Sequence, residues 1–140
     1  METAFFLYRS RTALTPRSAK CADILRESRA RNLSLALTGY LHLEDGSFYQ
    51  WLEGPAVALN DVGEMIERDP RHHDVDFLWR GHQNGRQFQN WQMGFGTSNA
   101  GILFDWVANE GIQVSDGGAF ARGLLAFMRL QLILRPAGSA

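Results

Sequence analysis

The sequence has a single cysteine, no excess charge of either sign and no long apolar run. Cys21 alone cannot form an internal disulfide or a multi-thiolate zinc site, which fits a reducing compartment. The 14 basic and 15 acidic residues give a net charge of -1, so no positive field favours nucleic acid or an anionic membrane. No segment approaches the roughly 18 apolar residues of a membrane span. We expect a cytoplasmic protein that binds neither nucleic acid nor membrane.

A sizeable core is expected nevertheless, because 45% of the 140 residues are hydrophobic. The segment 4–9 predicts a first strand with Phe6 and Tyr8 on one face and Phe5 and Leu7 on the other. Since both faces are apolar, we expect this strand to be buried on both sides.

Two helices are predicted from capping residues and apolar spacing. Thr15 and Pro16 are typical of an N-cap and a first helical position, and the apolar stripe behind them runs to about Arg31. A second helix is predicted to open after Gly54 and to end at Asp69, which precedes a proline.

A β-hairpin is predicted between these helices. The segments 36–44 and 47–53 flank Asp45 and Gly46, which both tolerate the positive φ of a two-residue turn. Alternation then places Gln50 on an otherwise apolar strand face. Because an unpaired buried amide costs about 1–3 kcal/mol, protein groups or a bound polar ligand must satisfy it.

The remaining segments complete the predicted order βαββαββ. Further strands are expected over 75–80 and 88–95, which gives an α+β, ferredoxin-like sheet with two helices on one face. The apolar segments 102–108 and 120–134 supply a cover for the other face. The apolar surface left over on 120–134 favours self-association or a partner protein.

The most specific pattern combines polar and aromatic residues on the expected elements. Tyr8 lies on the first strand, Asn32 on the first helix and Gln50 on the hairpin, and the sequence Trp-Gln-Met-Gly occupies 91–94. Each of these residues alone is more often an ordinary core residue. Together, over about residues 3–97, they resemble a BLUF domain, the flavin-binding blue-light sensor module.

The resemblance implies a specific site. FAD, with FMN or riboflavin as substitutes, would lie non-covalently between the two helices against the sheet. Tyr8 would be the light-driven electron and proton donor and Gln50 the hydrogen-bonded relay. Trp91 or Met93, which alternation places on one strand face, would lie beside the Gln50 amide. The implied cofactor contacts are Tyr8, Ser28, Arg31, Asn32, Gln50, Asp69, Arg71 and His72.

The resemblance also implies sensing rather than catalysis. It indicates a photosensor domain over 1–97 and a C-terminal helical cap or output extension over 98–140. The signal would pass through the last strand and the C-terminal helix to a separate effector, such as a cyclic-nucleotide enzyme or a transcription regulator. We also expect a homo-oligomer.

Two other functions fit the same fold. An acylphosphatase-like hydrolase would use an arginine and an asparagine to stabilise phosphoryl oxygens, although the loop after the first strand lacks phosphate-binding glycines. A light-insensitive member would keep the fold as a protein-binding module. No metal is expected at His72 and His73, because adjacent histidines diverge and no further cysteine or histidine lies at ligand spacing.

Overall fold

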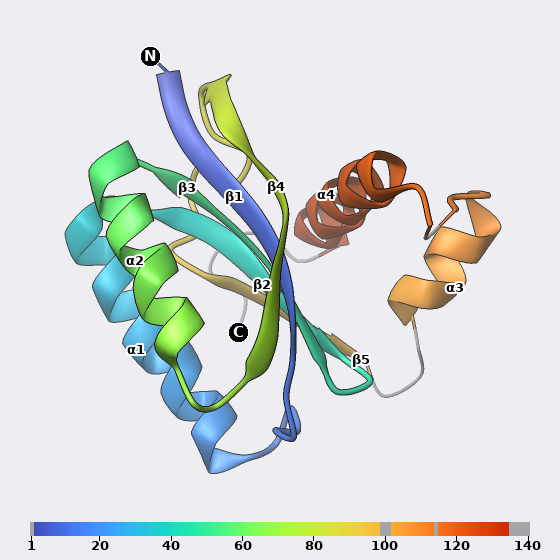
Figure 1. Ribbon diagram of the computed structural model, residues 1–140, viewed down its shortest axis with the longest axis horizontal. Coiled ribbons are helices and arrows are strands. Elements are labelled where there is room, and N and C mark those ends of the chain that lie inside the picture. The colour runs from blue at the N-terminus through green and yellow to red at the C-terminus, as the bar shows by residue number, and fades with distance from the viewer. Residues whose placement is uncertain (1, 99–101, 114, 135–140) are drawn as a thin grey trace.

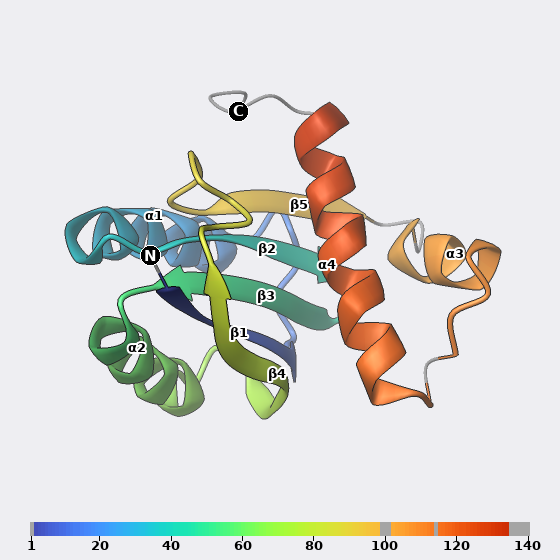
Figure 2. The same ribbon diagram turned by 90° about the horizontal axis from the view of Figure 1, so that it is seen from above.

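The computed structural model describes residues 2–98, 102–113 and 115–134, without the side chains of 98 and 132–134. A sheet separates two helical layers (Figure 1). The helices α1 (Ala19–Leu35) and α2 (Ala56–Arg68) cover one face, and α3 (Ile102–Asn109) and α4 (Gly117–Leu134) lie beyond the other, with α4 crossing the strands (Figure 2). No helix of the described ranges is long and apolar enough to cross a membrane.

The sheet has five strands in the order β4-β1-β3-β2-β5. β5 pairs with β2 in parallel, and the other neighbours are antiparallel. This arrangement confirms the α+β, ferredoxin-like prediction. The strands are β1 (Glu2–Arg11), β2 (Thr38–Glu44), β3 (Ser47–Gly54), β4 (His73–Asn84) and β5 (Gly94–Ser98).

The predicted hairpin is confirmed in its turn and in its register. Asp45 and Gly46 have φ values of 48° and 74°, the left-handed region that a tight turn of this kind requires. Leu41 on β2 pairs with Gln50 on β3, and Leu43 pairs with Phe48. The Gln50 side chain therefore lies on the sheet face that α1 and α2 cover.

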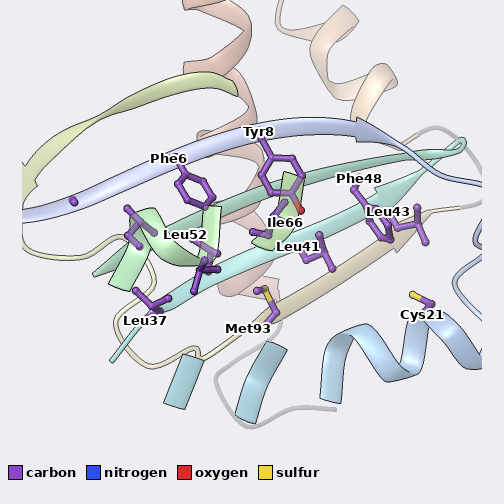
Figure 3. Close-up of a cluster of buried hydrophobic side chains, with 13 residues drawn as sticks. Phe6, Tyr8, Cys21, Leu37, Leu41, Leu43, Phe48, Leu52, Ile66 and Met93 are labelled. Atoms are coloured by element: carbon purple, nitrogen blue, oxygen red, sulfur yellow. The ribbon is translucent and has the colours of Figure 1, made fainter. Parts of the chain in front are cut away.

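Alternation along β1 and β3 supplies two separate cores. Phe6 and Tyr8 are buried with the residues under α1 and α2, which Figure 3 shows in close-up. Phe5 and Leu7 are buried with Phe120 and its neighbours on α4. The C-terminal segment thus covers the second face, as its composition predicted. Leu130 is 36% exposed on α4, whereas the predicted apolar side chains of 132–134 lie outside the described residues.

The first helix starts later than its sequence predicted. Its N-cap is Ser18, whose Oγ accepts a hydrogen bond from the backbone N–H of Cys21 at 3.2 Å. The carbonyl of Thr15, the expected cap, instead accepts from the backbone N–H of Ser18 at 3.0 Å. The helix also continues beyond Arg31 to Leu35, and Ala36 follows as a left-handed C-cap with φ of 57°.

The prediction of a strand over 88–95 is wrong for most of its length. The chain forms a turn at 88–91, where Trp91 N–H donates to the carbonyl of Phe88 at 3.0 Å, and β5 begins only at Gly94. A glycine is needed there, because a Cβ at position 94 would come within 2.5 Å of the Tyr40 ring. The apolar residues of 88–93 do not share one face, because Phe88 and Trp91 pack into the core under α4 and Met93 packs into the core under α1 and α2.

A buried carboxylate joins the end of β2 to the first C-terminal helix. Glu44 is fully buried, and its Oε1 lies 3.0 Å from Nε2 of His42. The same oxygen accepts from the backbone N–H of Leu103 at 2.8 Å, and Oε2 accepts from that of Phe104 at 3.3 Å. Glu44 thus satisfies N–H groups that the first turn of α3 leaves without helical partners.

Replacing Glu44 should weaken the attachment of α3 to β2 and destabilise the protein. Glu44→Ala removes the acceptor of two backbone N–H groups, those of Leu103 and Phe104, and we expect the free energy of unfolding to fall by roughly 3 kcal/mol. Urea denaturation measures the change. The matched control is Glu64→Ala, which removes an exposed carboxylate 3.6 Å from Arg68 and should cost less than about 1 kcal/mol. Equal losses in the two variants would contradict a structural role for Glu44.

Candidate functional site

A hydrogen bond between adjacent strands forms the deepest part of the candidate site. The β1–β3 register places Tyr8 directly opposite Gln50. The Tyr8 hydroxyl donates to Oε1 of Gln50 at 2.5 Å, and both side chains are buried. Burial raises the pKa of the Tyr8 phenol well above its ordinary value, so Tyr8 stays a neutral hydrogen-bond donor at physiological pH.

Met93, not Trp91, lies against the Gln50 amide. Nε2 of Gln50 donates to Sδ of Met93 at 3.6 Å. Figure 3 shows Met93 in the same cluster as Tyr8 and Leu41. Trp91 packs with the residues on the opposite side of the sheet, so the prediction that Trp91 and Met93 share a face is wrong. The reason is the turn before β5, which lacks the alternation of a strand.

A pocket lies over the Tyr8–Gln50 pair, between α1 and α2. Its empty volume is about 490 Å³, including the part open to solvent. Ile24 on α1 and Ile66 on α2 face it from the two helices, and Leu41 and Phe48 face it from the hairpin. The remaining lining residues are Tyr8, Glu27, Ser28, Arg31, Gln50, Asp69, Arg71 and His72.

The structure brings seven of the eight predicted cofactor contacts to this pocket. Asn32 is the exception, because it is fully buried beside the pocket and does not line it. Its Nδ2 donates to the carbonyl of Gln92 at 2.6 Å, and its Oδ1 accepts from the guanidinium of Arg31. Asn32 therefore ties α1 to the segment that carries Met93. Its role as a flavin contact stays a prediction.

An ion-pair cluster forms part of the pocket rim. Arg71 lies 2.7 Å from Asp69 and 3.2 Å from Glu27, so it joins the end of α2 to α1. Hydrogen bonding from Arg71 holds the pKa of Asp69 below its usual value, and the bond to Asp69 raises the pKa of Arg71. The sequence indicated Asp69 and Arg71 but not Glu27, whose position four residues before Arg31 on α1 was the available signal.

His72 is held by hydrogen bonds at both ring nitrogens. Nδ1 lies 2.7 Å from Oγ of Ser10, and Nε2 lies 2.6 Å from the carbonyl of Ile66. A carbonyl only accepts, so Nε2 carries the proton and a neutral ring accepts at Nδ1 from the Ser10 hydroxyl. His72 therefore faces the pocket with its ring while its polar atoms fix the start of β4.

Glu53 is an anchor that the sequence analysis did not assign. This fully buried carboxylate accepts five hydrogen bonds and holds the segment before Met93 against the sheet. The sequence does contain a signal for it, because Glu53 lies on the same strand face as the aromatic residues Tyr49 and Trp51. Its donors are Thr38 Oγ1, Trp51 Nε1, Gln83 Nε2 and the backbone N–H groups of Gln87 and Phe88, at 2.7 to 3.0 Å.

A tyrosine, a glutamine and a methionine are in contact beneath a pocket, where the resemblance implied a tyrosine, a glutamine and either Trp91 or Met93. The family model described as "Sensors of blue-light using FAD", abbreviated BLUF, matches residues 4–94. This chain belongs to the BLUF family.

Individual relatives agree with this assignment. The photoactivated adenylate cyclase subunit beta of Euglena longa is 44% identical to the BLUF chain over 52 residues, which are 37% of this chain and 6% of that protein. The chain spans less than a tenth of each curated relative it matches. Among solved structures, the BLUF protein BlrB in its dark state has a TM-score of 0.73 and 29% identity, covering 90% of this chain and 97% of that chain.

A larger protein contains a similar BLUF fold. The manganese and cyclic diGMP complex of Klebsiella pneumoniae BlrP1 has a TM-score of 0.65 and 30% identity. The match covers 94% of this chain and 34% of that chain. Blue-light sensing is the function of the family, and its domains occur in proteins with other activities.

The raised pKa of Tyr8 predicts a loss of stability in alkali. Below about pH 10 the phenol is protonated in both the folded and the unfolded chain, and stability is unaffected. Above that pH the unfolded chain loses this proton first, so the free energy of unfolding should fall by up to about 1.4 kcal/mol per pH unit. Urea denaturation of the wild type and of Tyr8→Phe between pH 8 and about 11 isolates Tyr8, because Tyr49 is present in both. Parallel pH profiles would contradict the prediction.

Proposed function

We propose that this BLUF chain is a blue-light photoreceptor that binds FAD non-covalently, with FMN or riboflavin as substitutes, and has no catalytic activity of its own. The observation that carries the proposal is the buried series of contacts from Tyr8 to Gln50 to Met93 beneath the pocket. A purely structural core would be better filled by apolar side chains than by a phenol bonded to an amide.

The pocket residues fit a flat, largely apolar ring with one polar edge. Ile24 and Ile66 can contact the two faces of such a ring from opposite helices, as apolar side chains do in most small-molecule sites. Gln50 has two N–H groups, and within the described ranges one has Met93 as its acceptor while the other has none. A carbonyl at the ring edge would supply that acceptor.

The chemistry of the site follows from the Tyr8–Gln50 hydrogen bond. A bound flavin excited by blue light is a strong oxidant, which ground-state flavin is not. Tyr8 is buried and neutral, so it can give up both an electron and a proton. A phenol that has lost an electron is very acidic, so its proton would pass along the 2.5 Å bond to Oε1 of Gln50, and the amide would release a proton from Nε2 toward the reduced ring.

Gln50 converts this transfer into a lasting change. Its two ends differ, since Oε1 accepts and Nε2 donates, so rotation or tautomerisation of the amide exchanges the group that faces the ligand. A stronger hydrogen bond to a flavin carbonyl shifts its absorption to the red. The sulfur of Met93 is a weak acceptor and opposes the exchange only weakly.

The route from Gln50 to a partner passes through Met93 and β5. Met93 precedes β5 directly, and β5 leads to α3 and α4 on the other side of the sheet. A shift of Met93 therefore acts on the strand that precedes the C-terminal helices in the chain. We infer that this segment, 98–140, relays the signal from the photosensor over 1–97 to a separate effector. A cyclic-nucleotide enzyme is the first candidate because photoactivated adenylate cyclase subunits are among the relatives, and a transcription regulator is the second.

Substitutions in the relay should abolish the light response without unfolding the protein. Tyr8→Phe removes the electron and proton donor, and Gln50→Leu removes the amide, yet both keep the buried volume nearly unchanged. Absorption spectra of the flavin-loaded proteins, taken before and after a blue pulse, should show a red shift in the wild type and none in either variant. The proposal fails if the loaded wild type shows no shift or if either variant retains it.

Replacing Met93 should alter the dark recovery. Met93→Ala removes the sulfur that accepts from Gln50 in the orientation of the structure, which we assign to the dark state. A lost hydrogen bond of roughly 0.5–1.5 kcal/mol should slow the return of the red-shifted band by about two- to tenfold. Absorbance recovery after a light pulse measures the rate. Trp91→Phe, on the opposite face, is the control, and an equal slowing there would exclude a specific role for Met93.

A further inference from the structure

Arg31 is a cation of the pocket wall that has no carboxylate partner. Its Nε and Nη2 donate to Oδ1 of Asn32 at 3.3 and 3.2 Å, and none of the acidic groups in the described ranges forms an ion pair with it. Arg71, the other lining arginine, is paired with both Asp69 and Glu27. Arg31 therefore donates its hydrogen bonds to a neutral amide, while the carboxylates of Asp69 and Glu27 act on its charge only from a longer distance than an ion pair.

Arg31 acts on the inner part of the pocket. Ile24, Ser28 and Arg31 line the wall at the spacing of one helix face, four and three residues apart. Burial raises the pKa of Tyr8, and the positive charge of Arg31 opposes that rise, so the charge is felt at the phenol. Burial also lowers the pKa of Arg31 itself. A ligand above Tyr8 and Gln50 would lie within the same field.

We propose that Arg31 tunes the reduction potential of the bound flavin by stabilising the negative charge that the ring gains on reduction. The inference rests on the proposed function, in which one electron leaves Tyr8 for the ring and the phenol proton passes to Gln50. A guanidinium keeps its charge at every relevant pH and is less strongly hydrated than an ammonium. In a partly desolvated wall it favours a reduced, anionic ring over the neutral oxidised ring.

A phosphate of FMN or FAD is the other source of negative charge that a guanidinium could bind. Arg31 lines the same pocket as Tyr8 and Gln50, which favours the ring, because a ring bound there would contact these two residues and the phosphates would extend toward solvent. Riboflavin separates the two sources, since it has the ring and no phosphate.

The test compares the full-length wild type with Arg31→Gln, each loaded in turn with riboflavin, FMN and FAD. Dissociation constants are measured for oxidised flavin in air and for reduced flavin under anaerobic conditions, at mildly alkaline pH. We expect Arg31→Gln to weaken binding of reduced flavin relative to oxidised flavin by about tenfold with all three ligands, which corresponds to about 30 mV for a two-electron couple. Arg31→Lys keeps the charge and should retain most of the wild-type preference, even if the glutamine variant folds poorly.

Arg26→Gln is the matched control. It makes the same charge change on the same helix, but Arg26 is 69% exposed, pairs with Asp23 at 2.7 Å and does not line the pocket. Its ratio of dissociation constants should equal that of the wild type.

Three outcomes would overturn the inference. Arg31→Gln could leave the ratio unchanged while the wild type shows its red shift, which would refute only the role of Arg31. A loss confined to FMN and FAD, equal for oxidised and reduced forms, would assign Arg31 to a phosphate. A wild type that binds none of the three flavins would refute the proposed function and this inference with it.

Discussion

Strand register is the constraint on which the rest of the structure depends. The pairing of Tyr8 with Gln50 follows from the antiparallel alignment of β1 and β3. Because side chains alternate between faces, a slip of one residue would place the phenol and the amide on opposite sides of the sheet. Pairing of β1 with β4 on its other side holds the alignment in place, as does the hydrogen bond of 2.9 Å from the backbone N–H of Thr12, just after β1, to the carbonyl of Gly46 in the hairpin turn.

Buried carboxylates fix the segment that connects the pocket with the C-terminal helices. Glu53 holds the chain just before Met93, and Glu44 holds the start of α3 just after β5. Both carboxylates lie on elements of the central hairpin, so the segment between them is attached at its two ends to the same rigid unit. Between these two attachments, Met93 contacts Gln50, so a change in the orientation of the Gln50 amide would act on this segment.

The parts of the fold set by local rules could be predicted from the sequence. The hairpin, the second helix and the two faces of β1 follow from turn residues, capping and alternation, and the structure confirms them. The start of α1 was missed because Thr15 and Ser18 are both good N-cap residues, and only the backbone shows which one accepts the bond from Cys21. The false strand over 88–95 has a different cause, because its turn depends on Glu53, a side chain more than thirty positions away in the sequence.

The sequence predicted most of the residues of the candidate site, but not all of the contacts between them. The sequence pattern indicated that Tyr8 and Gln50 would meet. It did not indicate whether Met93 or Trp91 would reach the Gln50 amide. Glu27, which completes the rim cluster with Arg71, was not predicted, because that contact joins residues 44 positions apart. Its formation depends on how closely α1 approaches the end of α2.

The fifth strand is short and lies at the edge of the sheet, where β2 is its one partner in the part of the chain that the structure describes. A five-residue parallel strand is held by few hydrogen bonds, and its glycines contribute no side chains to the packing. If β5 lifts away, the N–H and C=O groups along one side of β2 lose their partners and become available to a strand from another chain. Protection of the β2 backbone against solvent exchange is thus tied to whether β5 stays in place.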